Sequence, residues 1–272
     1  MTASPPPTDP PTEPLRVERR DDGVVLVTLA RPELRNAMTA ELTAAWGDAM
    51  AALRRDRTLR CVVVTGDGPA FCAGGDLGWI AGSPDLRVDD LRARMLAFYR
   101  TWLSIRDLDV PTIAAVNGAA VGAGLCLALA CDLRWAAAGA RLSAPFASLG
   151  LHPGMAATWL LPEVVGVARA RELLLTGRAV DAAEAAAIGL VNAVVPADAL
   201  LDEALRVAAT VAGQAPVAIR LTKEALRAGR PASYEDALAW EGLAQPVTMA
   251  TDDLREGIAA ARERRAPRFT GR

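Results

Sequence analysis

The glycine-rich stretches Phe71-Cys72-Ala73-Gly74-Gly75-Asp76-Leu77 and Asn117-Gly118-Ala119-Ala120-Val121-Gly122-Ala123-Gly124 decide how this chain is interpreted. Each follows an apolar run typical of a buried strand, at 61–65 and 112–116, and each leads into a helical pattern. Small residues let a ligand approach the main chain, and the start of a helix leaves backbone N–H groups unpaired. Two such corners can direct two N–H donors at one oxygen, which stabilises an oxyanion formed at a carbonyl.

The composition is that of a globular protein with a substantial core. Of the 272 residues, 52% are hydrophobic and 23% are charged, and the formal net charge is −2. This balance excludes a global field that would recruit nucleic acid or an anionic membrane. The four cysteines have no CxxC spacing and the chain has one histidine, so the sequence argues against a metal site. We expect reduced, buried thiols.

Hydrophobic periodicity predicts an α/β fold followed by a helical part. Strands are expected at 24–29, 61–65, 112–116, 133–136 and 190–195, and helices at 39–53, 91–108, 122–131, 163–176 and 181–187. Beyond residue 200 the pattern is helical throughout. We therefore predict a disordered Pro-rich tail at 1–14, a core at 15–198 and a C-terminal helical region at 199–272.

Nothing in the N-terminal segment has the character of a secretory signal, because it lacks both a basic region and an apolar region. The longest apolar region, 113–131, contains Asn117 and several glycines, which favour a strand, a turn and a buried helix over a membrane span. We expect a cytoplasmic protein.

Further motifs follow the two glycine-rich stretches in a fixed order. They are Arg31–Met38, Ala130–Arg134, Leu149–Gly154, Leu173–Gly177, Ala186–Asn192, Glu256–Gly257 and Pro267–Gly271. With these motifs the chain resembles the crotonase (enoyl-CoA hydratase/isomerase) superfamily, from Val17 to Gly271. The resemblance implies a spiral of ββα repeats that binds acyl-CoA, a C-terminal α-helical trimerisation region, and a homotrimer or a dimer of trimers.

The ligand implied by the resemblance is an acyl-CoA thioester, with coenzyme A as part of the substrate and no separate cofactor. The resemblance assigns the oxyanion-hole donors to the backbone N–H groups of Gly75 and Ala123. It implies further contacts with CoA: the adenine against main chain near Ala37, Ala73 and Leu77, the phosphates near Arg35, and a basic contact from Arg264 and Arg265. An aromatic residue common in the last helix of the family is replaced by Ala261.

Three positions depart from the family pattern. Hydratases of the family use two glutamates to activate water; Cys126 stands at the first of these positions and Phe146, after Pro145, at the second. Gly154 stands where some isomerases carry an aspartate. A positioned acid or base typically contributes about 10²–10⁴-fold in rate. We therefore expect weak hydration at most, and favour isomerisation, decarboxylation or C–C cleavage. The alternative is a non-catalytic acyl-CoA-binding protein.

Two residues are candidates for replacement chemistry. His152 can act as a general base near neutral pH, or can be a histidine hydrogen-bonded behind its loop. Cys126 is expected to face the acyl group, and its apolar neighbours Leu125 and Leu127 favour packing over nucleophilic attack.

Other residues are expected to shape the site. Asp76 would hold the Gly75 corner through hydrogen bonds to backbone amides. Trp79, Phe146 and Trp159 would form an apolar chamber for an acyl or ring-bearing group. A nucleotide-binding protein is excluded, because the sequence has neither a GxGxxG nor a P-loop signature.

Overall fold

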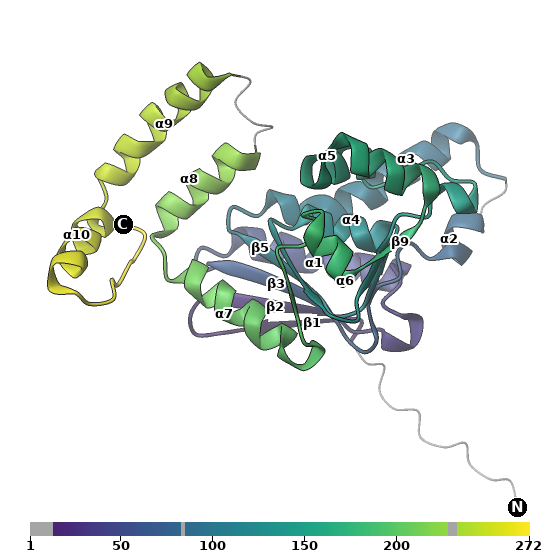
Figure 1. Cartoon of the computed structure of the whole chain (residues 1–272), viewed down its shortest axis with the longest axis horizontal. Helices are drawn as coiled ribbons and strands as arrows, with labels where there is room; N and C mark the ends of the chain where they lie inside the picture. Colours follow the sequence, from purple (N-terminus) through teal and green to yellow (C-terminus); the bar gives the residue numbers. More distant parts are fainter. Residues whose placement is uncertain (1–12, 83–84, 228–232) are drawn as a thin grey trace, which may run out of the picture.

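The structure, a computed structural model, describes residues 13–82, 85–227 and 233–272. Figure 1 shows an α/β body with a sheet at its centre, from which the last helices extend to one side. The predicted disordered tail at 1–14 lies outside the described residues, apart from Glu13 and Pro14.

The larger sheet has six strands in the order β1-β2-β3-β5-β7-β10. They are β1 (Leu15–Arg19), β2 (Val24–Leu29), β3 (Cys61–Gly66), β5 (Thr112–Val116), β7 (Leu133–Ala137) and β10 (Ala193–Val195). The first pair is antiparallel and the remaining pairs are parallel. The strands β2, β3 and β5 are buried along their whole length, which explains their continuous apolar sequences.

A second sheet has four strands in the order β4-β6-β8-β9, each three residues long. They are β4 (Ala70–Cys72), β6 (Ala119–Val121), β8 (Arg141–Ser143) and β9 (Ala179–Asp181). Three residues are too few for an alternating pattern to be read from sequence, and none of these strands was predicted. The chain passes from a long strand of the first sheet to a short strand of the second and then into a helix, three times in succession.

Helices pack on both faces of the larger sheet. The helices of the α/β body are α1 (Ala40–Arg55), α2 (Leu77–Ala81), α3 (Val88–Leu103), α4 (Ala123–Ala130), α5 (Ala157–Thr176), α6 (Ala182–Ala187) and α7 (Leu200–Ala212). Val25 and Val27 of β2 belong to the core beneath α1, α3, α4 and α5, where Trp46 stacks on Trp102 at 5.0 Å between ring centroids. Val24 and Leu26 belong to the core beneath α7. This division follows from the two-residue period of a strand.

The last three helices, α8 (Pro216–Arg227), α9 (Tyr234–Met249) and α10 (Asp252–Glu263), extend away from the sheet in Figure 1. The buried Lys223 connects α8 to the body, since its Nζ donates to the Asp132 carboxylate at 2.8 Å and to the Val110 carbonyl at 2.6 Å. A helical region was predicted from residue 199. Its first helix, α7, packs on the larger sheet, and the three helices after it do not belong to that core.

Several predicted boundaries differ from the structure. The sequence predicts a loop at 79–90, whereas α2 extends to Ala81 and α3 already begins at Val88. Helix α5 begins six residues earlier than predicted, at Ala157, and is interrupted at Gly166. Within the described ranges, no helix is both long and apolar enough to cross a membrane.

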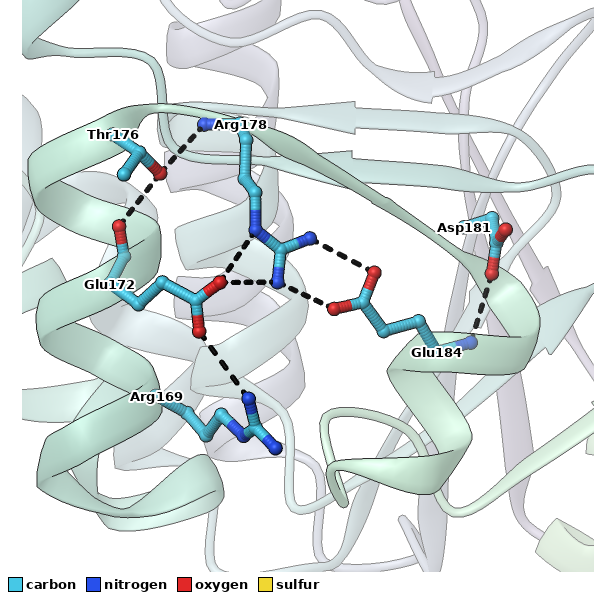
Figure 2. A network of polar contacts seen from close by, with 6 residues as sticks. All are labelled: Arg169, Glu172, Thr176, Arg178, Asp181 and Glu184. Atoms are coloured by element: carbon cyan, nitrogen blue, oxygen red, sulfur yellow. Dashed lines mark hydrogen bonds and ion pairs between the residues drawn. The ribbon is translucent and has the colours of Figure 1, made fainter.

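An ion-pair network holds the connection from α5 to α6, next to β9 (Figure 2). The guanidinium of Arg178 contacts Glu172 on α5, with Nε–Oε1 at 2.8 Å, and contacts both carboxylate oxygens of Glu184 on α6 at 2.9 and 2.6 Å. Arg169 adds a second contact to Glu172 at 3.4 Å. Hydrogen bonding to Arg178 lowers the pKa of both glutamates and raises that of Arg178. These carboxylates are therefore engaged in structure.

We predict that Arg178→Gln lowers the thermal unfolding midpoint at neutral pH, and that the difference from wild type shrinks in acid. The pKa values of Glu172 and Glu184 are lowered in the folded state, so their stabilisation is present above the unfolded-state pKa of about 4.3 and is lost as the pH falls through the lower folded-state values. Thermal melts from neutral pH to about pH 3 measure this. A difference that does not vary with pH would contradict an electrostatic role.

Candidate functional site

The two glycine-rich motifs meet because the strands before them are neighbours. Strand β4 lies parallel to β6, so the residues after each strand emerge at the same edge of the second sheet. A Cβ atom added to Gly74 would lie 2.5 Å from the Val121 carbonyl oxygen and 3.3 Å from the Ala123 nitrogen. This close approach of two main chains needs glycine at position 74, where φ is +96°.

Helix α4 begins directly against the first motif. A Cβ atom on Gly124 would lie 2.1 Å from the Cys72 carbonyl oxygen, so the helix packs on the end of β4 without an intervening side chain. Gly122 precedes the helix with φ 55° and ψ −115°, and its N–H donates to the Ser143 carbonyl at 2.9 Å. Ala123 is consequently the first helical residue, at the positive end of the α4 dipole.

The backbone N–H groups of Gly75 and Ala123 are available for a ligand. Among the hydrogen bonds formed within the described ranges, neither group has an acceptor. Gly75 is partly exposed and Ala123 is 8% exposed. The two donors therefore lie on adjoining loops next to the N-terminus of a helix.

A buried asparagine and the segment around it fix the first motif. The Asn36 side chain donates to the carbonyl oxygens of Asp67 and Ala70 at 2.9 and 2.8 Å. The neighbouring backbone pairs with the glycine corner, because the Ala73 N–H donates to Arg35 and the Met38 N–H to Gly74, at 2.9 and 2.8 Å. These contacts explain why the motif at 31–38 accompanies the glycine motifs.

Asp76 has the structural role expected for it. One oxygen of its carboxylate accepts the N–H groups of Gly78 and Trp79, at 2.8 and 3.2 Å, and so caps α2. Because this cap follows Gly75 directly, it holds the corner that carries the Gly75 N–H.

Cys126 lies on the first turns of α4, close to Ala123, and is buried. Its Sγ lies 3.7 Å from the Gly154 carbonyl oxygen, so the positions assigned to the first glutamate and to the isomerase aspartate are in contact. Burial raises the pKa of the Cys126 thiol to about 12. The thiol is therefore neutral at physiological pH, which favours packing over nucleophilic attack.

Phe146 lies at the second glutamate position and faces the start of α4. Its ring carbons lie 3.8 Å from a Cβ atom added to Gly122. The structure thus brings Phe146 and Cys126 to the corner that carries the free N–H groups.

The other two aromatic residues predicted to form the chamber are placed differently. Trp79 packs on Phe98 at 5.1 Å between centroids and lines a groove of about 480 Å³ between α1 and α3. The Arg94 guanidinium lies 3.9 Å from the Trp79 ring centroid. Trp159 is 56% exposed on α5 and has no ring partner among the described residues. A chamber formed by all three predicted aromatics is therefore not assembled within the chain.

His152 is exposed on the loop before α5. Its Nδ1 lies 2.8 Å from the carbonyl oxygen of the next residue, Pro153. Gly154, two residues after His152, is buried and its carbonyl oxygen contacts the Sγ of Cys126.

The residues assigned to CoA fall into two groups. Arg35, Ala37, Ala73 and Leu77 belong to the glycine corner, where Arg35 and Leu77 are exposed. Arg264 and Arg265 follow α10, which Figure 1 shows at the opposite end of the molecule from α2. Arg265 is also engaged by Glu256 and Glu263, with contacts of 2.6 Å to each. Within one chain, these two arginines do not reach the glycine corner.

One residue of the site was missed by sequence reasoning. Tyr99 on α3 points its hydroxyl at Gly154: a Cβ atom added to that glycine would lie 2.5 Å from the Tyr99 oxygen. The sequence offered one signal, since Tyr99 is one of two tyrosines in the chain and lies three residues before the buried Trp102 on an amphipathic helix. Across the described part of the chain, His, Cys, Asp and Glu do not gather into a group of three or more that could hold a metal ion.

Comparison with known proteins gives a consistent result. The enoyl-CoA hydratase/isomerase family model matches residues 19–272. A Mycobacterium tuberculosis protein named "Probable enoyl-CoA hydratase echA8" is 40% identical over 253 residues, covering 93% of this chain and 96% of that protein. The 1,2-epoxyphenylacetyl-CoA isomerase of Escherichia coli is 36% identical, covering 93% of this chain and 97% of that protein.

The fold agrees with solved structures as well. The crystal structure of an enoyl-CoA hydratase from Bacillus anthracis superposes with a TM-score of 0.89 at 34% identity, and the match covers 95% of this chain and 100% of that chain. The chain therefore belongs to the enoyl-CoA hydratase/isomerase family and has the crotonase fold. Both were expected from the motifs.

We predict that none of the four cysteines reacts with iodoacetamide in the native protein at about pH 8, and that all four react after unfolding in urea. The attacking species is the thiolate, and burial raises the pKa of each thiol to about 12. Mass spectrometry of intact protein counts the labels. Rapid native labelling of Cys126 would contradict the buried, neutral thiol described above.

Proposed function

We propose that this protein is an acyl-CoA-processing enzyme that stabilises a thioester enolate between the backbone N–H groups of Gly75 and Ala123. The observation that carries the proposal is a pair of N–H groups on two adjoining loops, one of them at a helix N-terminus, for which the described part of the chain supplies no acceptor. Such donors act on charge as it develops on an oxygen, and a low-dielectric surrounding strengthens them.

The reaction class follows from the neutral residues beside these donors. Cys126 and Phe146 stand where the family's hydratases carry glutamates, and neither side chain can activate water at neutral pH. Isomerisation, decarboxylation and C–C cleavage remain, because in these reactions the substrate's own groups replace part of an acid–base pair. The relatives named as hydratases and as an isomerase support acyl-CoA processing in general.

The second candidate is a non-catalytic acyl-CoA-binding protein. The neutral residues Cys126 and Phe146 favour this candidate as well, because a site with donors for the carbonyl oxygen and no acid at these two positions can bind a thioester without converting it. The two candidates differ in turnover and share thioester binding.

We also propose a cytoplasmic homotrimer, or a dimer of trimers, assembled through the C-terminal helices. The support is the apolar surface of α8 and α9, where several large hydrophobic side chains are exposed in the single chain: Leu226, Tyr234, Leu243, Val247 and Met249.

We expect Ala123→Pro to abolish most of the turnover while the protein stays folded. Proline removes the N–H at position 123 and suits the first residue of a helix. The residue before proline favours an extended backbone. Gly122, with φ 55° and ψ −115°, has nearly the mirror image of that conformation, which glycine adopts as readily because it has no Cβ atom. Loss of one such donor typically lowers kcat by about 10²–10³-fold.

The assay is a panel of thioesters, followed by mass spectrometry for hydration, CO₂ release and exchange of the α-proton in D₂O. Val88→Pro is the matched control, because Val88 is the first residue of α3 and is 79% exposed. Wild-type turnover that survives in Ala123→Pro would contradict the enolate site. Binding of acyl-CoA by the wild type without any turnover would favour the non-catalytic alternative.

A further inference from the structure

The side chain of Tyr99 occupies the space next to the position where the family's isomerases carry an acid. A Cβ atom on Gly154 would lie 2.5 Å from the Tyr99 hydroxyl oxygen and 3.0 Å from the ring carbon that bears it. Any side chain at residue 154 would therefore collide with Tyr99. Glycine at position 154 thus leaves room for the Tyr99 side chain. The phenol of Tyr99, on α3, lies where the family's isomerases have a carboxylate from the loop before α5.

The Tyr99 hydroxyl is also close to the start of α4. The carbonyl oxygen of Gly154 lies 3.7 Å from the Sγ of Cys126, and Cys126 follows Ala123 by three residues, which places both on the same side of the helix. A continuous set of contacts thus connects the Tyr99 hydroxyl, through Gly154 and Cys126, to the N–H group of Ala123.

The hydroxyl is free to act on a ligand. Tyr99 is partly exposed, and no hydrogen bond of its hydroxyl is found within the described residues. A partly buried phenol normally finds a partner for its O–H group. The ring is held in place by its edge contact with Phe98, at 6.2 Å between centroids, on a helix that packs on α1 and α4.

The surroundings of Tyr99 keep its phenol protonated. Burial raises the pKa of the Tyr99 phenol above its ordinary value, and the neighbouring Cys126 adds to the shift. At neutral pH the group is thus a neutral phenol. A neutral phenol can protonate a carbanion-like carbon, whereas it cannot remove a proton from the α-carbon of a thioester.

We propose that the Tyr99 hydroxyl is the proton donor of this site, and that it protonates the enolate left when a 2-carboxyacyl (malonyl-type) thioester loses CO₂. The inference rests on the enolate function proposed above and specifies its substrate class. Because neither Cys126 nor Phe146 can act as a base, the substrate class that fits is one that forms its enolate by losing a group, and a carboxylate on the α-carbon provides that group.

The step balances without a further reactant. The bond between the α-carbon and the carboxylate carbon breaks, its electron pair moves to the thioester oxygen, and CO₂ leaves. The N–H groups of Gly75 and Ala123 hold the enolate oxygen. The Tyr99 O–H proton then passes to the α-carbon, the carbonyl re-forms, and the phenolate takes a proton from water. The net reaction consumes one proton and releases one CO₂, with no redox change.

The uncharged walls of the site agree with this chemistry. Cys126 is neutral, Phe146 is aromatic, and Met155 next to Gly154 is 1% exposed. Such a surrounding offers little solvation to a localised carboxylate and penalises it relative to the transition state, in which the charge spreads to the bound thioester oxygen.

The test uses malonyl-CoA and a 2-methylmalonyl thioester in D₂O with the full chain. We expect wild type to release CO₂ from both thioesters and, with the 2-methylmalonyl thioester, to place deuterium on one face of the α-carbon. We expect Tyr99→Phe to lose this stereochemical control or to slow turnover by about 10²–10⁴-fold, with unchanged affinity for a saturated acyl-CoA. Tyr234→Phe is the control, since it removes the chain's other tyrosine hydroxyl at a site 72% exposed on α9.

A second variant tests the position of the Tyr99 hydroxyl without removing it. Gly154→Ala keeps the hydroxyl but displaces it, because the added Cβ atom would lie 2.5 Å from it, and we expect the same loss. The proposal is overturned if Tyr99→Phe releases CO₂ at the wild-type rate and forms one enantiomer, or if His152→Ala alone abolishes both.

The outcomes also separate this inference from the proposed function. Wild type that exchanges α-protons or converts other thioesters, and releases no CO₂ from either carboxyacyl thioester, overturns the role of Tyr99 and leaves the enolate site standing. Wild type that binds no acyl-CoA overturns both.

Discussion

The direct contact of main chain with main chain at the ends of β4 and β6 is the constraint on which this molecule depends. Gly74 lies against Val121 and Ala123, and Gly124 lies against Cys72, at distances that no side chain could share. Because these backbones touch, the first turn of α4 is brought beside the corner that carries Gly75. Asn36 and the cap on α2 hold the corner from the other side. The fold thus presents two backbone N–H groups at one corner, and the side chains of Asn36 and Asp76 hold that corner in place.

The consequence is a site whose polarity comes from the backbone. On the α4 side of the two donors lie a buried, neutral thiol at Cys126 and an aromatic ring at Phe146, while the Asp76 carboxylate beside Gly75 is engaged by the backbone N–H groups of α2. In such surroundings a hydrogen bond to a developing oxyanion is stronger than in water, and little competing charge is present. The carboxylates of Glu172 and Glu184 are engaged by Arg178 on the α5–α6 connection (Figure 2). The proposed enolate chemistry accordingly draws on the substrate and on neutral donors.

The sequence predicted the long buried strands and the two glycine corners because each has a strong local signal: a continuous apolar run in β3 and β5, and glycine where main chains approach. The four short strands carry no such signal, because three residues cannot show a period. Tyr99 was missed for a different reason. Its partner Gly154 is distant in the chain, and their contact exists only after α3 packs on the core. Trp159 was expected in the site from its residue type, whereas on α5 its side chain is 56% exposed.

The central claim is that two backbone N–H groups bind one thioester carbonyl oxygen, and its most direct test is isotope-edited infrared spectroscopy. A saturated acyl-CoA carrying carbon-13 at the thioester carbonyl is bound to the protein, and the C=O stretching band is compared with that of the free ligand. The account predicts a band shifted to lower frequency, because hydrogen bonds from the Gly75 and Ala123 N–H groups polarise the carbonyl. A bound thioester whose band stays at the frequency seen in water would contradict it.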